Sequence, residues 1–179
     1  MATSSNPYYA DVLAGNVFIG STAAAGVALP IATGTAVTCA LWNTSITRNA
    51  VLLGVTYGVT SGTIALGEIG LANQAVGNAV ASGGPITAAT AGTAKNALLG
   101  AGTSSVMTFV PATATLAGGG TACLWLGKSI ESATAGLGIF DGVSWLPVPL
   151  VIPAGQIVFL CASVAQTALI TASMIWEEV

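Results

Sequence analysis

The chain contains no histidine and few charged residues. Among its 179 residues are three basic and six acidic side chains, whereas about a quarter of the residues in an ordinary soluble domain are charged. Histidine is the usual acid–base group near neutral pH, so its absence excludes Ser/His/Asp and Cys/His catalytic arrangements. Because charge normally keeps a protein surface soluble, we expect that lipid or a protein assembly covers much of this molecule.

The acidic residues do not form a recognisable catalytic pair. Glu177 and Glu178 are adjacent, so in a strand they point to opposite faces and cannot share one substrate atom. The glycine clusters at residues 83–85 and 118–120 lack the following helix and lysine of a phosphate-binding loop. We therefore expect a protein that is not an enzyme and that binds no cofactor.

The basic residues and cysteines exclude two further classes of site. A net charge of −3 with three basic residues argues against a nucleic-acid partner, because binding typically neutralises about six or more phosphates. Cys39, Cys123 and Cys161 are widely spaced in apolar runs, so we interpret them as buried thiols rather than metal ligands. The N-terminus lacks the pattern of a secretory signal, which predicts folding in a reducing cytoplasm.

Three long stretches without a charge raise the possibility of membrane spans. These stretches are residues 12–47, 69–94 and 142–176, and each is interrupted every few residues by Gly, Pro, Thr, Ser or Asn. Such interruptions would leave backbone groups unpaired in hydrocarbon, and no positive residues flank the stretches as they do around typical spans. The sequence therefore favours a protein assembly over a membrane.

The interruptions separate short segments with the pattern of β-strands. Residues 49–60 alternate, which predicts Val51, Leu53 and Val55 on one face and Leu52 on the other. Residues 170–177 alternate in the same way. Further strand candidates are residues 12–19, 35–42, 63–69, 105–110, 121–126, 138–140, 143–147 and 156–163. This pattern suits an all-β fold, an antiparallel β-sandwich of jelly-roll type with a short N-terminal arm and long loops.

The chain is long enough for one domain with a full core, and we expect an arm over residues 1–11 followed by a single domain over residues 12–179. Asp141-Gly142 predicts a tight hairpin turn, and Pro153-Ala154-Gly155 predicts a turn before the next strand. Residues 72–101 have weak periodicity and are interpreted as a long loop, with at most a turn or two of helix at residues 93–99.

Four aromatic residues are candidates for an interface. Trp42 and Trp176 lie in strand candidates, a position that favours packing in the core or between subunits. Tyr8 and Tyr9 lie in the polar arm, where two aromatic rings gain stability only by docking. The surface that they pack against is either a neighbouring subunit or the chain's own core.

Several segments form an ordered set along the second part of the chain. They are residues 41–43, 49–53, 59–63 with Gly67, residues 69–70, 96–100 and 152–155, and the closing Ile175-Trp176-Glu177-Glu178-Val179. Taken together they resemble small virion proteins of tailed bacteriophages, and the likeness extends over about residues 39–179.

The resemblance implies a jelly-roll β-sandwich, often trimeric, that decorates or cements a capsid. On that basis we expect a homotrimer that contacts the major capsid protein or other virion proteins on the capsid surface, with Tyr8, Tyr9, Trp42 and Trp176 at the subunit or capsid interface. Assembly would take place in the cytoplasm of the bacterial host. The alternatives are a head or tail spike or fibre that binds a host receptor or glycan, and a shell-forming protein outside phages.

Overall fold

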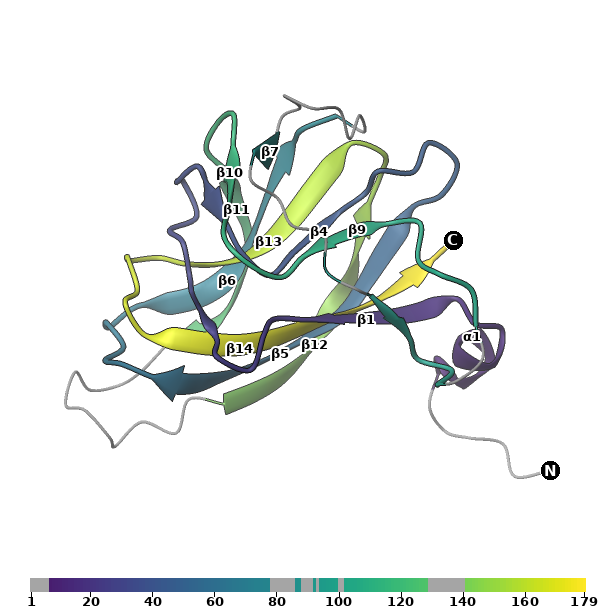
Figure 1. The fold of residues 1–179 in the computed structure, drawn as a ribbon, viewed down its shortest axis with the longest axis horizontal. Coiled ribbons are helices and arrows are strands. Elements are labelled where there is room, and N and C mark those ends of the chain that lie inside the picture. The colour runs from purple at the N-terminus through teal and green to yellow at the C-terminus, as the bar shows by residue number, and fades with distance from the viewer. Residues whose placement is uncertain (1–6, 78–85, 88–91, 93, 100–101, 129–140) are drawn as a thin grey trace.

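The computed structural model describes residues 7–77, 86–87, 92, 94–99, 102–128 and 141–179 (Figure 1). Strands predominate in these residues, and the helix among them is the short α1 (Tyr9–Leu13). All the paired strands run antiparallel. The predicted all-β fold with antiparallel sheets is confirmed.

The strands form two large sheets and one small one. Sheet A has the order β12 (Asp141–Ile152), β5 (Ala50–Ser61), β14 (Leu169–Glu178), β1 (Val17–Ser21) and β8 (Lys95–Asn96), and β2 (Val27–Ala28) also pairs with β14. Sheet B has the order β11 (Thr121–Lys128), β6 (Glu68–Ala75), β13 (Gln156–Ala162), β4 (Ala40–Trp42) and β9 (Thr108–Val110). Sheet C has the order β3 (Ala36–Val37), β10 (Ala114–Leu116) and β7 (Ile86–Thr87).

Sheet B is the middle layer of the molecule. In Figure 1, β4, β9 and β13 lie between β7 and β10 above and the long strands of sheet A below. Leu160 of β13 packs in the core between sheets A and B, whereas its neighbour Phe159 packs in a second core with Leu116 of sheet C. Burial on both faces explains why residues 157–162 form a continuous apolar run, a pattern typical of strands covered on both sides.

Strand β14 shows the opposite pattern. Its residues alternate strictly between partly exposed and buried positions from Leu169 to Glu178, because only one of its faces meets the core. The predicted alternation of residues 170–177 is confirmed.

A β-bulge changes the predicted faces of β5. Ile175 of β14 pairs with Gly54 of β5, and the next residue, Trp176, pairs with Leu52. Leu53 is therefore an extra residue on β5. An extra residue reverses which side chains face inward beyond it. Leu52 therefore lies in the core with Val55, and the prediction that Leu52 and Val55 lie on opposite faces is wrong. Leu53 is also buried, at 3% exposure.

Three local predictions are also corrected. Asp141 and Gly142 belong to β12 and pair with Gly58 and Tyr57 of β5, because pairing along a long neighbouring strand outweighs a local turn preference. Residues 72–75 continue β6 instead of forming a loop, and the candidate helix at residues 93–99 contains the strand β8.

The strand predicted at residues 12–19 begins later than expected. Residues 9–13 form α1, and the first strand, β1, begins only at Val17. The turn before β13 is confirmed: Gln156 N–H donates to the Pro153 carbonyl at 3.1 Å, and Gly155 has a φ of 77° that favours glycine. The strand candidate at residues 138–140 lies outside the described residues.

Candidate interaction surface

Loops from distant parts of the sequence meet where β14 ends. Asn49 and Val179 exchange two backbone hydrogen bonds of 2.9 and 3.0 Å. The Thr44 hydroxyl donates to the Val106 carbonyl at 3.1 Å. These bonds join the loop between β4 and β5, the segment before β9 and the carboxyl-terminal residue into one end of the molecule.

The helix α1 and the segment after β8 are joined beside this end. The Asn96 amide donates to the Gly15 carbonyl at 2.6 Å, and Ala97 N–H donates to the Val17 carbonyl at 2.8 Å. Figure 1 shows α1 and the C-terminus at the same side of the molecule.

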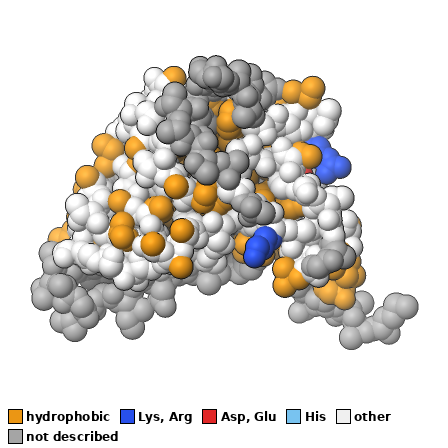
Figure 2. All heavy atoms as spheres, in the orientation of Figure 1, with side chains coloured by type: hydrophobic (Ala, Val, Ile, Leu, Met, Phe, Trp, Pro, Cys, Tyr) orange, Lys and Arg blue, Asp and Glu red, His pale blue; other side chains and the backbone are white. Residues whose placement is uncertain are grey.

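Large apolar side chains are exposed on these segments. Ile46 and Leu99 are 79% and 80% exposed. Figure 2 shows hydrophobic side chains on this side of the molecule, on a surface that is otherwise mostly uncharged in this view. We call this set of residues the terminal face: Tyr9, Leu13, Ile46, Leu99, Val106 and Val179.

A buried carboxylate lies directly under the terminal face. Glu178 is 3% exposed, and its carboxylate accepts hydrogen bonds from the Ser105 hydroxyl at 2.5 Å, from Val106 N–H at 3.2 Å and from Trp176 Nε1 at 3.4 Å. The half-exposed Arg48 lies 3.8 Å from it. A buried charge is tolerated only when such partners replace water. Glu178 therefore holds the segment of Ser105 and Val106 against β14, and it pairs with Arg48 of the loop between β4 and β5.

A second carboxylate at this end has a different environment. Partial burial raises the pKa of Glu177, and the negative charge of Asp11 on α1 raises it further. Two acids alone do not make a metal site, and the described part of the chain contains no group of three or more His, Cys, Asp or Glu side chains that could hold a metal ion.

Two of the four predicted interface residues lie inside the chain. Trp176 is completely buried and stacks between Phe18 and Phe109, with ring centroids 6.1 Å away on each side. Trp42 is buried in the second core, and its Nε1 donates to the Gly77 carbonyl at 2.8 Å. Both side chains belong to the cores, so their assignment to an interface is corrected: neither reaches the surface of the chain.

The other two predicted residues lie at the edge of the described chain. Tyr9 begins α1 and is half-exposed on the terminal face, and Tyr8 is partly buried just before it. Their contact with a partner stays a prediction.

The cysteines divide into two groups. Cys39 and Cys161 are buried as predicted. Burial raises the pKa of the Cys39 thiol to about 12, and burial together with the neighbouring Cys123 raises that of Cys161 to about 12. Cys123 is exposed on β11, so its assignment as a buried thiol is wrong; β11 lies at the edge of sheet B.

The role of Glu178 at this end of the molecule was not predicted from the sequence. A signal was present, because Glu178 follows Met174 and Trp176 at a spacing of two and therefore shares their inward face. Its partners Ser105 and Arg48 could not be found in that way, because they come from other parts of the chain.

No protein-family model, curated protein or solved structure matches this chain. None of the helices in the described residues is long and apolar enough to cross a bilayer.

Proposed function

We propose that the chain is a non-enzymatic structural protein of a bacteriophage virion. In this proposal it is a trimeric decoration or cement protein, which bridges the major capsid subunits at the capsid surface after assembly in the host cytoplasm. The observation that carries the proposal is the terminal face, where large apolar side chains are exposed and where Glu178 binds the segment of Ser105 and Val106 to β14.

The strand order supports the jelly-roll part of the proposal. The orders β12-β5-β14-β1 and β11-β6-β13-β4 match the two four-stranded sheets of a jelly roll. The chain crosses between sheets A and B at each step from β4 to β6 and again from β11 to β14. Strands β8 and β9 then extend the two sheets on one side.

The chemistry of the surface supports a permanent partner. An exposed apolar patch on a monomer commonly marks a protein interface, and contacts that lack charge change little with salt. A protein that binds only the assembled lattice stabilises that lattice by mass action. Three copies around an axis would add avidity to weak single contacts.

The first test is the mass of the purified protein in solution. Size-exclusion chromatography with light scattering is expected to give three times the chain mass of 17.4 kDa. A single species with the mass of one chain at micromolar concentration would contradict the trimer.

The second test is co-sedimentation with expanded capsids of the phage that encodes the chain. The double substitution Ile46→Asp and Leu99→Asp places charges on the terminal face and is expected to weaken binding by more than about tenfold. Leu66→Asp is the matched control, because Leu66 is also exposed but lies in the loop between β5 and β6, outside the terminal face. Equal capsid binding by both variants would contradict the proposed role of the face.

A further inference from the structure

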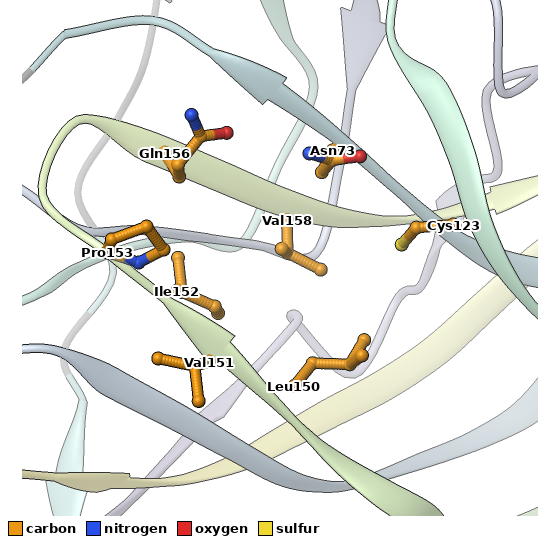
Figure 3. Close-up of a pocket in the computed structure, with 8 residues that line it drawn as sticks. All are labelled: Asn73, Cys123, Leu150, Val151, Ile152, Pro153, Gln156 and Val158. Atoms are coloured by element: carbon orange, nitrogen blue, oxygen red, sulfur yellow. The ribbon is translucent and has the colours of Figure 1, made fainter.

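A pocket opens where strand β12 of sheet A approaches strands β6, β11 and β13 of sheet B. It has a volume of about 290 Å³, near the lower end of the range of about 300–1,000 Å³ typical of ligand sites. Its walls are mainly aliphatic, and none of the described lining residues carries a charge (Figure 3). The lining residues are Asn73, Cys123, Leu150, Val151, Ile152, Pro153, Gln156 and Val158.

Two side-chain amides stand on one wall of the pocket. Val158 pairs with Asn73 across β13 and β6, so Asn73 and Gln156 are diagonal neighbours on the same face of sheet B. Figure 3 shows the two amide groups turned toward one another. The Gln156 side-chain oxygen is buried without a hydrogen-bond partner, so it is not open to the pocket and would accept a hydrogen bond from a ligand only after the amide turns toward the lining.

A β-bulge completes the opposite rim. Cys123 is the extra residue on β11 between Ala122 and Leu124, and bulges commonly redirect a side chain. Cys123 lines the pocket and its thiol donates to the Leu71 carbonyl at 3.3 Å. The pocket therefore has a thiol beside it that can report occupancy.

These features define the ligand. A charged group would find no opposite charge among the described lining residues, and a purely aliphatic group would leave the Gln156 oxygen unpaired. An amide next to an aliphatic side chain offers an N–H, a C=O and an apolar body together. Strands β11 and β12 are the edge strands of the two sheets beside the pocket, and an edge strand can also pair with an extended peptide.

We propose that this pocket binds an uncharged peptide segment, with an aliphatic side chain between Leu150 and Val158 and a peptide group on the Asn73 and Gln156 amides. No residue of the terminal face lines the pocket, so binding here is separate from the proposed capsid contact. The two proposals can fail independently.

The test uses N-acetyl-leucine-N-methylamide, which carries one leucine side chain between two peptide groups. Titration into the labelled protein is followed by NMR at the side-chain amides of Asn73 and Gln156, and by the rate at which iodoacetamide alkylates Cys123. For a probe of this size we expect a saturable shift with a Kd of about 1 mM and slower alkylation of Cys123 at saturation. N-acetyl-leucine, which is charged, and N-acetyl-leucine methyl ester, which lacks one N–H, are expected to bind about tenfold more weakly.

Two variants locate the binding. Gln156→Met keeps the length of the side chain and removes the amide. It is expected to raise the Kd of N-acetyl-leucine-N-methylamide about tenfold. Gln74→Met is the matched control: its side-chain oxygen is also buried without a partner, but Gln74 does not line the pocket. The absence of a saturable shift up to about 10 mM, equal binding of all three probes to the wild-type protein, or unchanged binding by Gln156→Met would overturn the proposal.

Discussion

Two segments of this chain have nearly the same sequence and different surroundings. Residues 38–42 read Thr-Cys-Ala-Leu-Trp, and residues 121–125 read Thr-Ala-Cys-Leu-Trp. Trp42 of the first segment is 3% exposed, whereas Trp125 of the second segment is 41% exposed. Cys39 of the first segment is buried, whereas Cys123 of the second is exposed.

The positions of the two strands explain the difference. Strand β4 lies between β13 and β9, and Trp42 packs in the second core with Val37 and Leu116 of sheet C. Strand β11 is an edge strand that pairs only with β6 among the described strands. The comparison teaches that an apolar strand becomes an interior or an edge strand according to what packs over it, which its own residues do not state.

The largest expected difference between the two segments is in their tryptophans. Trp42→Ala is expected to lower the free energy of unfolding by about 3–5 kcal/mol, because it leaves a cavity and an unpaired Gly77 carbonyl. Trp125→Ala is expected to cost about 1 kcal/mol or less, because its ring is already partly in water. Urea unfolding followed by circular dichroism measures both. Similar costs for the two variants would show that β11 is covered in solution.

The next largest expected effect concerns the packing of the Trp125 side chain against Gly70. Gly70 pairs with Trp125, and a Cβ at Gly70 would lie 2.5 Å from the Leu124 carbonyl oxygen and 2.6 Å from the ring. Gly70→Ala is therefore expected to cost about 1–3 kcal/mol of unfolding free energy.

Gly58→Ala is the control for this substitution, because the nearest atom to its Cβ would be Thr171 Oγ1 at 3.8 Å, an ordinary contact. We expect it to change stability by less than about 0.5 kcal/mol. Equal costs at both glycines would mean that Trp125 does not pack on Gly70.

The cysteines give a smaller difference. Cys39→Ser buries a hydroxyl in place of an apolar thiol and is expected to cost about 1–2 kcal/mol of unfolding free energy. Cys123→Ser changes a partly exposed group and is expected to cost less than about 0.5 kcal/mol. The same urea experiment measures the unfolding free energies of both variants. A larger loss of stability for Cys123→Ser than for Cys39→Ser would contradict the assignment of Cys39 as buried and Cys123 as exposed.

Alkylation rates compare the exposure of the cysteines without requiring a substitution that changes stability. Iodoacetamide is expected to modify only Cys123 in the folded protein, because Cys39 and Cys161 are buried with a thiol pKa of about 12. Partial burial also raises the pKa of the Cys123 thiol. Its rate should therefore rise about tenfold per pH unit from pH 7 towards that pKa, since only the thiolate reacts. Mass spectrometry of peptides from the folded protein measures each site, and modification of Cys39 at a similar rate would contradict its burial.

Local patterns were sufficient where one strand face meets one core. The alternation of residues 170–177 predicts β14 because its inward face is apolar at every second position. The same reasoning placed Leu52 and Val55 on opposite faces, because the bulge on β5 becomes visible only when β14 is placed beside it. It also predicted a turn at Asp141, where pairing with β5 extends the strand instead.

The candidate surfaces were harder to predict than the fold. Tyr9 was identified from its unusual place in a polar arm, but Ile46, Leu99 and the buried Glu178 were not. Their importance depends on loops far apart in sequence that meet at one end. The pocket likewise combines side chains from four strands.

The amino-acid sequence by itself determined that this chain is built of strands and that its surface carries little charge. Both properties follow from composition and from a spacing of two residues, which act locally along the chain. Only the tertiary structure decided which tryptophan is interior, which cysteine is exposed and where the carboxylate of Glu178 finds its hydrogen-bond partners. Burial depends on the partner that packs over a residue, and that partner comes from a distant part of the chain.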